Sequence, residues 1–362
     1  MMKYIDDFRN GELAKALADK LKSTVKRPMT VMEVCGTHTM SIFRNGIREL
    51  LPEGFRLVSG PGCPVCVTPQ GYLDEAFKLA QRKDIIIATF GDMLRVPGTK
   101  SSLMQEKAQG GDVRIIYAPL DAVELAENNF NKQIVFLGVG FETTAPVVAL
   151  TILEASRRGL SNYSVFSAHK TVPSAMAVLV SDPELEIEGF LCPGHVSTVI
   201  GAQAYDFLAK DHGIPAVIAG FESVDVLQGL LNLAELIQSG RAEVINSYTR
   251  IVTTQGNQKA LEIMNQVFMA GPSTWRGIGV IPESGLQIRP EYEAFDTHKL
   301  FNIQPADLEI PNGCSCGEIL KGKLTPLECK LYSTVCTPET PMGACMVSTE
   351  GTCAAYYKYH QG

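Results

Sequence analysis

Short apolar runs alternate with longer amphipathic segments along most of the chain. Residues 11–25 carry apolar side chains at helical spacing with polar residues between them, which predicts an amphipathic helix. Apolar runs of strand length and further helical patterns follow, the strands at residues 30–34, 55–58, 85–89 and 113–117 and the helices at residues 72–82 and 102–109. This alternation is typical of an α/β fold with a mostly parallel sheet.

An internal repeat runs through this pattern. Four matches occur in the same order at an offset of 131 or 132 residues: residues 34–38 with 165–169, 61–63 with 193–195, Phe90 with Phe221, and Val113 and Tyr117 with Val244 and Tyr248. A fixed offset indicates a duplicated structural unit. We therefore expect two tandem α/β domains, residues 1–125 and 126–280, that face each other across a cleft.

A third, smaller unit is expected at residues 281–362. The stretch from Gly271 to Gly285 is punctuated by Gly and Pro, which is typical of a connector. Six of the ten cysteines then lie between Cys314 and Cys353.

Composition narrows the functional classes. The net charge is −7 and no dense run of Lys or Arg occurs, which argues against nucleic acid or an anionic membrane as the main partner. No window resembles a signal peptide or a membrane span, so a cytoplasmic location is expected. In a reducing compartment ten cysteines favour metal ligation or thiol chemistry over structural disulfides.

The C-terminal cysteines predict a metal centre, because the stretch has few long apolar runs and a bound metal can replace a missing core. Thiolate ligands suit an iron–sulfur cluster or zinc, and a purely redox-active group of thiols is a further alternative. The residues concerned are Cys314, Cys316, Cys329, Cys336, Cys345 and Cys353.

Three further thiols lie in the first half of the repeat. Cys63 and Cys66 occupy a loop rich in Gly and Pro after a predicted strand, either as a redox dithiol or as half of a zinc site that Cys35 and His38 would complete. Cys35 itself follows a strand and is either an activated thiol, a metal ligand or an inert core residue. At the positions of Cys35, Cys63 and Cys66 the second half has Phe166, His195 and Thr198.

Several other polar residues also follow predicted strands. Glu142, His195 and His169 beside Lys170 are candidate acid–base groups, although a lone histidine is often satisfied locally. Cys192 is interpreted as a core residue. No complete glycine-rich nucleotide motif occurs.

Five motifs together resemble the HypD family, which serves the maturation of the iron centre of nickel–iron hydrogenases. The resemblance covers nearly the whole chain and rests on residues 33–39 (Glu33-Val34-Cys35-Gly36-Thr37-His38-Thr39), 60–66, 140–146, 192–197 and 343–357.

The resemblance implies a [4Fe-4S] cluster whose cysteines are separated by fourteen, six and sixteen residues. Here that spacing selects Cys314, Cys329, Cys336 and Cys353, and leaves Cys316 and Cys345 as a possible redox pair beside the cluster. It also implies a stable complex with the small protein HypC and a transient one with HypE, which delivers cyanide.

The family function implied is a scaffold that holds Fe(II) while two cyanides and one carbon monoxide are attached. Cys35 would bind this iron, Cys63 and Cys66 would handle electrons, and His38, Glu142 and His195 would supply protons or hydrogen bonds. An alternative is a cluster-linked thiol–disulfide oxidoreductase similar to ferredoxin:thioredoxin reductase.

Overall fold

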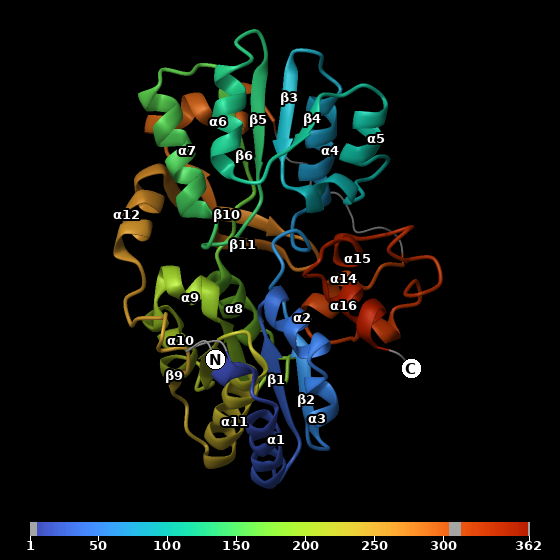
Figure 1. Ribbon diagram of the computed structural model, residues 1–362, viewed down its shortest axis with the longest axis vertical. Helices are drawn as coiled ribbons and strands as arrows, with labels where there is room; N and C mark the ends of the chain where they lie inside the picture. The colour runs from blue at the N-terminus through green and yellow to red at the C-terminus, as the bar shows by residue number, and fades with distance from the viewer. Residues whose placement is uncertain (1–5, 304–312, 361–362) are drawn as a thin grey trace.

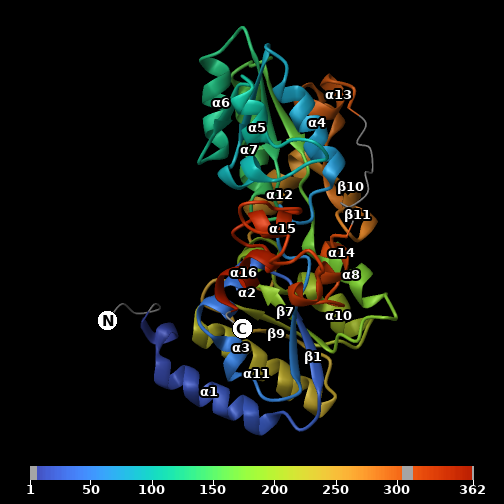
Figure 2. The same cartoon turned by 90° about the vertical axis from the view of Figure 1, so that its right-hand side faces the viewer.

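The computed structural model describes residues 6–303 and 313–360. Two α/β lobes lie one above the other, and the C-terminal segment packs against one side of the waist between them (Figure 1). In the turned view this segment lies at mid-height, between the lobes (Figure 2).

The lower lobe is built on a parallel sheet of five strands in the order β2-β1-β7-β8-β9. Its strands are β1 (Met29–Glu33), β2 (Phe55–Ser59), β7 (Gly189–Pro193), β8 (Ala216–Ala219) and β9 (Val244–Asn246). Its helices are α1 (Gly11–Thr24), α2 (Gly36–Arg44), α3 (Ile47–Leu50), α8 (Val172–Val180), α9 (Gly194–Ile200), α10 (Asp206–Lys210) and α11 (Ser223–Ser239).

The upper lobe is built on a parallel sheet of four strands in the order β4-β3-β5-β6. Its strands are β3 (Ile85–Thr89), β4 (Val113–Ile115), β5 (Gln133–Gly138) and β6 (Tyr163–Ser167). Its helices are α4 (Gln70–Ala80), α5 (Leu103–Ala108), α6 (Pro119–Glu127), α7 (Ala145–Arg157), α12 (Gln258–Val267) and α13 (Thr297–Leu300). The α/β class and the parallel strands predicted from the sequence are confirmed.

The lobes do not follow the predicted tandem order, in which the chain would divide near residue 125. Strand β1 pairs with β7, and β3 pairs with β5, so each sheet combines strands from both expected domains. The chain crosses between lobes after β2, after β6 and after β9. The repeat compares short strand-and-loop pieces, and such local similarity does not decide which sheet a strand joins, because that choice depends on long-range packing.

Each sheet has a point at which the strand order reverses. In the lower lobe the chain leaves β1 toward β2 on one side, and leaves β7 toward β8 on the other. In the upper lobe the same reversal separates β3 from β5. Ligands of open parallel sheets bind outside the carboxyl ends of the strands at such switch points. Helices α2 and α9, which follow β1 and β7, lie at the waist (Figure 1).

The stretch expected to be a connector is instead an antiparallel hairpin at the waist. Strand β10 (Phe268–Trp275) pairs with β11 (Gly279–Ile288), and the register shifts between Gly271 and Ser273. Pro272 lies at this shift, where it has no partner in the other strand, so its lack of an N–H costs no hydrogen bond between the strands. The segment beyond it, with α13, packs on β6 of the upper lobe, and the described part of the cysteine-rich unit begins at residue 313.

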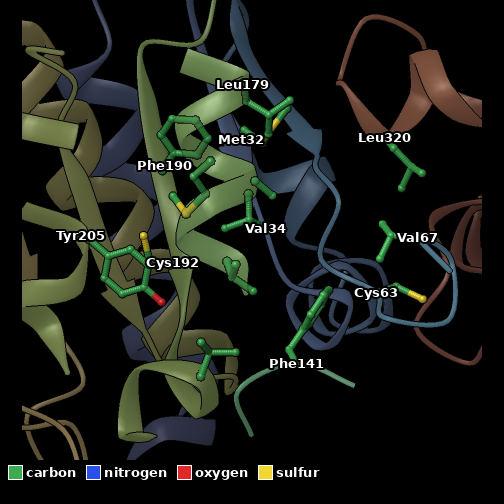
Figure 3. Packing of buried hydrophobic residues seen from close by; sticks show 14 of the residues in the cluster. Met32, Val34, Cys63, Val67, Phe141, Leu179, Phe190, Cys192, Tyr205 and Leu320 are labelled. Carbon is green, nitrogen blue, oxygen red and sulfur yellow. The ribbon is translucent and has the colours of Figure 1, made fainter. Parts of the chain in front are cut away.

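The cysteine-rich unit contains the short helices α14 (Cys316–Leu320), α15 (Ala344–Val347) and α16 (Thr352–Tyr359). Helix α16 packs on α2 through Phe43, Ala355 and Tyr356. One buried cluster reaches all three parts of the molecule, joining Cys192 and Tyr205 of the lower lobe, Phe141 of the upper lobe and Leu320 of the C-terminal unit (Figure 3). The waist is therefore packed like a core. Among the described residues no helix is long and apolar enough to cross a membrane.

Candidate metal centre

Cys35 lies where β1 ends and α2 begins, at the switch point of the lower sheet. It is the N-cap residue of α2 with extended backbone angles, its side chain caps nothing, and it is buried. Its Sγ lies 3.8 Å from Nδ1 of His195, in the first turn of α9. The neighbouring strands β1 and β7 therefore bring a thiol and an imidazole together from positions 160 residues apart.

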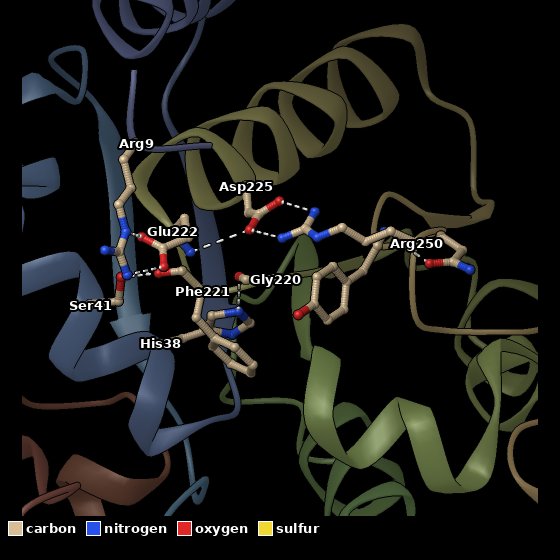
Figure 4. Close-up of polar contacts among 10 residues, drawn as sticks. Arg9, His38, Ser41, Gly220, Phe221, Glu222, Asp225 and Arg250 are labelled. Atoms are coloured by element: carbon tan, nitrogen blue, oxygen red, sulfur yellow. Dashed lines mark hydrogen bonds and ion pairs between the residues drawn. The ribbon is translucent and has the colours of Figure 1, made fainter. Parts of the chain in front are cut away.

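Two histidine rings pack against Phe221 beside this thiol. The ring of His38 is 4.8 Å from that of Phe221, and the ring of His195 is 5.1 Å from it, centroid to centroid. Nε2 of His38 lies 2.8 Å from the carbonyl oxygen of Gly220, so Nε2 carries the proton and Nδ1 has a free lone pair (Figure 4). Nδ1 of His38 is buried and has no hydrogen-bond partner among the described residues.

Burial keeps these groups uncharged. It lowers the pKa of His38 and of His195 to about 4, so both imidazoles are neutral near pH 7. Burial also raises the pKa of the Cys35 thiol well above its usual value. Without a bound cation the site is therefore a neutral thiol beside neutral imidazoles, and a cation would favour the thiolate.

Glu33, the last residue of β1, hydrogen-bonds to the backbone of Cys35. Its carboxylate accepts a hydrogen bond from the Cys35 N–H at 3.0 Å and one from the Thr39 hydroxyl at 2.5 Å. Burial raises the pKa of Glu33 to about 7. We did not single out Glu33 from the sequence, although an acid at the end of an apolar strand was the available signal.

The loop with Cys63 and Cys66 lies directly against Cys35. The N–H of Gly36 donates to the carbonyl oxygen of Gly62 at 2.9 Å, and a Cβ at Gly62 would lie 2.1 Å from the Cys35 nitrogen. Cys63 and Cys66 form a buried disulfide. The bonded Cys63–Cys66 pair is thus adjacent to Cys35, and its redox role stays a prediction.

Residues 348–350 of the C-terminal unit contact the Cys63 sulfur, the first turn of α2 and the upper lobe. The Ser348 hydroxyl lies 3.3 Å from Sγ of Cys63, and Glu350 accepts a hydrogen bond from the Thr37 hydroxyl at 2.6 Å. The Thr349 hydroxyl donates to Asp92 of the upper lobe at 3.1 Å. Burial raises the pKa of Glu350, which is near enough to Cys35 to influence its titration. No local sequence pattern indicated this bridge.

Glu142 follows β5, at the switch point of the upper sheet. Its Oε1 accepts a hydrogen bond from the Val172 N–H at 2.9 Å, while its buried Oε2 has no partner in the described part of the chain. Burial raises its pKa to about 7. Burial is the main cause of the raised pKa of Tyr205, and Glu142 and Cys35 both contribute to it.

The six C-terminal cysteines line one small cavity, together with the apolar side chains of Ile319, Leu331 and Met346. No group of three or more His, Cys, Asp or Glu side chains in residues 6–303 and 313–360 is arranged to hold one metal ion. Four thiolates around a four-iron cluster each bind a different iron atom and so lie farther apart than the ligands of a single ion. The convergence of thiols on an apolar cavity fits a cluster of this kind.

The other residues singled out from the sequence occupy three different places. Cys192 is a core residue beside Tyr205, as predicted. His169 and Lys170 follow β6 on the upper lobe and line a separate cavity with the β10–β11 hairpin. Cys316 and Cys345 line the cavity shared by the six C-terminal cysteines, where Cys316 contacts Cys314 and Cys345 contacts Cys353.

Comparison with known proteins gives one family. The HypD model, described as the "Hydrogenase formation hypA family", matches residues 12–360. The hydrogenase maturation factor HypD of Rhodobacter capsulatus is 47% identical, with 99% of this chain and 98% of that protein covered. The proteins of the same name from Cupriavidus necator and Escherichia coli are 45% and 43% identical over 99% of this chain and 97% and 99% of theirs. The chain therefore belongs to the HypD family.

Proposed function

We propose that this chain is a hydrogenase maturation factor that holds an iron ion at Cys35 while cyanide and carbon monoxide are attached to it. The observation that carries the proposal is the position of the Cys35 thiol, which lies at a switch point 3.8 Å from a neutral histidine. The maturation role itself is supported by the named relatives. The iron is the cargo of this reaction.

Binding of ferrous iron requires Cys35 to lose its proton, because the metal ligand is the thiolate. Nδ1 of His195 lies next to the thiol and, with a pKa of about 4, is unprotonated near neutral pH, so it would relay that proton and not retain it. The sulfur–proton bond is exchanged for a sulfur–iron bond, and the proton passes by way of His195 to the solvent. A thiolate suits iron that carries strong acceptor ligands.

We propose that two other buried polar groups serve the diatomic ligands. His38 and Glu142 each have a buried atom without a partner in the described structure, Nδ1 and Oε2 respectively. With a pKa of about 7, Glu142 is partly protonated and is able to donate to a cyanide nitrogen. With its proton on Nε2, neutral His38 presents only an acceptor at Nδ1, so it would have to change tautomer before donating to a cyanide nitrogen.

Cys314, Cys329, Cys336 and Cys353 would hold a [4Fe-4S] cluster, which supplies one-electron redox chemistry when bound. Ser348, in the same C-terminal unit, touches the sulfur of Cys63. We propose that the Cys63–Cys66 pair passes electrons toward the iron on Cys35. HypC would complete the coordination of the iron, and HypE would deliver cyanide.

Iron retention by anaerobically purified protein tests the scaffold. Cys35→Ala is expected to lose about one iron per chain while keeping its acid-labile sulfide, because the cluster ligands are unchanged. Cys192→Ala is the matched control, since Cys192 is an equally buried cysteine at the end of β7. Equal iron contents in the two variants would contradict the assignment of Cys35.

A second function, disulfide reduction, is favoured by the contact of the Cys63–Cys66 disulfide with the cysteine-rich unit. Catalytic turnover of a disulfide substrate by the chain alone, with a reductant and no partner protein, would support it. The absence of turnover together with Cys35-dependent iron retention would reject it.

A further inference from the structure

A cavity of about 560 Å³ lies on the upper lobe, apart from both centres described above. Its walls are the segment after β6, the β10–β11 hairpin and α13. Polar side chains line it, among them His169, Lys170, Ser273, Asp296 and His298. None of the residues to which the proposed iron chemistry was assigned contributes to its lining. Its volume falls in the range of sites for small organic molecules.

The wall of this cavity contains a buried lysine without a counter-charge. Lys170 is 1% exposed, and its Nζ donates to the Ser273 hydroxyl at 2.7 Å above the ring of Trp275. In the described part of the chain no carboxylate pairs with it. By contrast, the largely buried Arg250 forms a two-pronged ion pair with Asp225 (Figure 4).

A buried ammonium without a counter-charge is costly, because a neutral hydroxyl and an aromatic ring replace only part of the hydration it loses. Burial accordingly lowers the pKa of Lys170 to about 7, so charged and neutral forms coexist near neutral pH. A negative group placed in the cavity would supply the missing partner. The isolated lysine is thus explained by a site that is completed by an anion.

The remaining polar groups of the wall do not supply that anion. Nδ1 of His169 lies 3.1 Å from the Ser167 hydroxyl, and its buried Nε2 has no partner among the described residues. Burial lowers the pKa of His169 to about 3, so it stays neutral. Nε2 of His298 lies 3.3 Å from the carbonyl oxygen of Ser167.

Two charged groups come from the α13 side. Asp296 caps α13 by accepting from the His298 N–H, and burial raises its pKa. Lys299 is paired with Glu293 at 2.8 Å. Both charges therefore have local partners, whereas Lys170 is bonded only to a neutral hydroxyl.

We infer that this cavity binds a small molecule bearing a carboxylate or another oxyanion, which contacts Lys170 and the Ser273 hydroxyl. The site is separate from the iron centre and extends beyond the proposed scaffold function. The ligand's charge replaces the carboxylate that a buried lysine ordinarily has beside it.

Proton uptake is the signature of such a site. An anion beside Lys170 raises the pKa of its ammonium, so binding above pH 7 takes up a proton, approaching one per anion as the pH rises. Affinity is expected to fall about tenfold for each pH unit above 7. His169 is neutral throughout this range.

Isothermal titration calorimetry of the full chain with phosphate, bicarbonate, acetate and citrate tests the inference. Titrations at about pH 7 and 8, in buffers of different ionisation enthalpy, measure affinity and proton uptake together. At least one probe is expected to bind at a single site with the predicted pH dependence. Lys170→Met should weaken its binding at least tenfold, Ser273→Ala should weaken it less, and the exposed Lys259→Met should leave it unchanged.

Thermal unfolding without ligand separates this result from misfolding. Lys170→Met removes an unpaired buried charge, so its unfolding midpoint should equal or exceed that of the unsubstituted protein. Failure of all four anions to bind, binding that survives Lys170→Met, or binding without proton uptake would each overturn the inference. A further contradicting result would be protein that binds none of the four anions but in which borohydride, added with pyruvate, covalently traps pyruvate on Lys170. That result would indicate that Lys170 forms an imine instead.

Discussion

The residues around Cys35 are held in uncharged forms by burial. The thiol and the two histidines each lose hydration on burial. The pKa of the thiol is therefore raised and the pKa values of the histidines are lowered, so that the neutral form of each is favoured. Glu33 and Glu142 follow the same rule, with pKa values of about 7. A cation entering this site would lower the pKa of the Cys35 thiol, which is what formation of a ligand thiolate requires.

Glu33→Gln tests this electrostatic description. A folded pKa of about 7, against about 4.3 when unfolded, means that the stabilisation from protonated Glu33 is complete below pH 4.3 and is lost as the pH rises through 7. Gln does not titrate, so the stability of the variant relative to the unsubstituted protein should rise between about pH 5 and 7.5, by up to about 3 kcal/mol. Thermal unfolding at several pH values measures this, and a difference independent of pH would show that the Glu33 pKa is normal.

At the scale of elements, the proposed iron site depends on two segments that pack against the start of α2. The loop after β2 approaches so closely that only glycine fits at position 62, and residues 348–350 cover the same helix end from the C-terminal unit. A Cβ at Gly36 would likewise lie 2.4 Å from the Cβ of Glu350. The position of Cys35 is therefore set by neighbours from three parts of the chain.

Gly62→Ala is expected to disturb the iron site. The new Cβ would collide with backbone atoms of residues 34 and 35, so the free energy of unfolding should fall by about 2 kcal/mol and iron retention should be lost. Gly11→Ala is the control, because no atom lies within 4 Å of a Cβ there. Calorimetry and iron analysis of both variants provide the readout, and normal iron retention by Gly62→Ala would refute the close approach.

The C-terminal unit should depend on its metal centre for order. Its helices are short, and six cysteines line a cavity at the position where a larger unit would have an apolar core. A bound metal centre would supply the stability that such a core provides. Cys336→Ala is expected to raise hydrogen exchange throughout residues 313–360, whereas Cys316→Ala should leave it low because the four proposed ligands remain. Equal protection in the two variants, or zinc without sulfide in the unsubstituted protein, would contradict the cluster assignment.

At the scale of the whole molecule, the chain crosses the waist repeatedly and one buried cluster joins both lobes to the C-terminal unit. Local sequence patterns did not predict these crossings, but they predicted single elements correctly. The helix expected at residues 11–25 is α1, and the four expected strands are β1 to β4. These patterns also identified the thiols, because Gly- and Pro-rich loops after apolar runs are visible in sequence.

Other features were beyond local reasoning for a physical reason. The pairing of β1 with β7 joins segments about 160 residues apart, and side-chain packing in the folded state selects it. The contact of Cys35 with His195 follows from that pairing. The roles of Glu33 and of residues 348–350 follow from burial and from a long-range approach, neither of which a strand or loop pattern encodes.

The interleaved arrangement predicts how a fragment behaves. Residues 1–125 contain β1 and β2 without β7, and β3 and β4 without β5, so each sheet lacks its central partner. The isolated fragment is expected to show little ordered structure by circular dichroism, while the full chain unfolds cooperatively. A fragment that folds cooperatively by itself would instead support the tandem division at residue 125.

Infrared spectroscopy of the anaerobic complex with HypC, after cyanide transfer from HypE, tests the central claim most directly. Cyanide and carbonyl ligands on iron give stretching bands in a region nearly free of protein absorption. The complex should show these bands with the unsubstituted chain and with Cys192→Ala, and should lose them with Cys35→Ala. Undiminished bands in the Cys35→Ala complex would show that the iron is assembled without this thiolate.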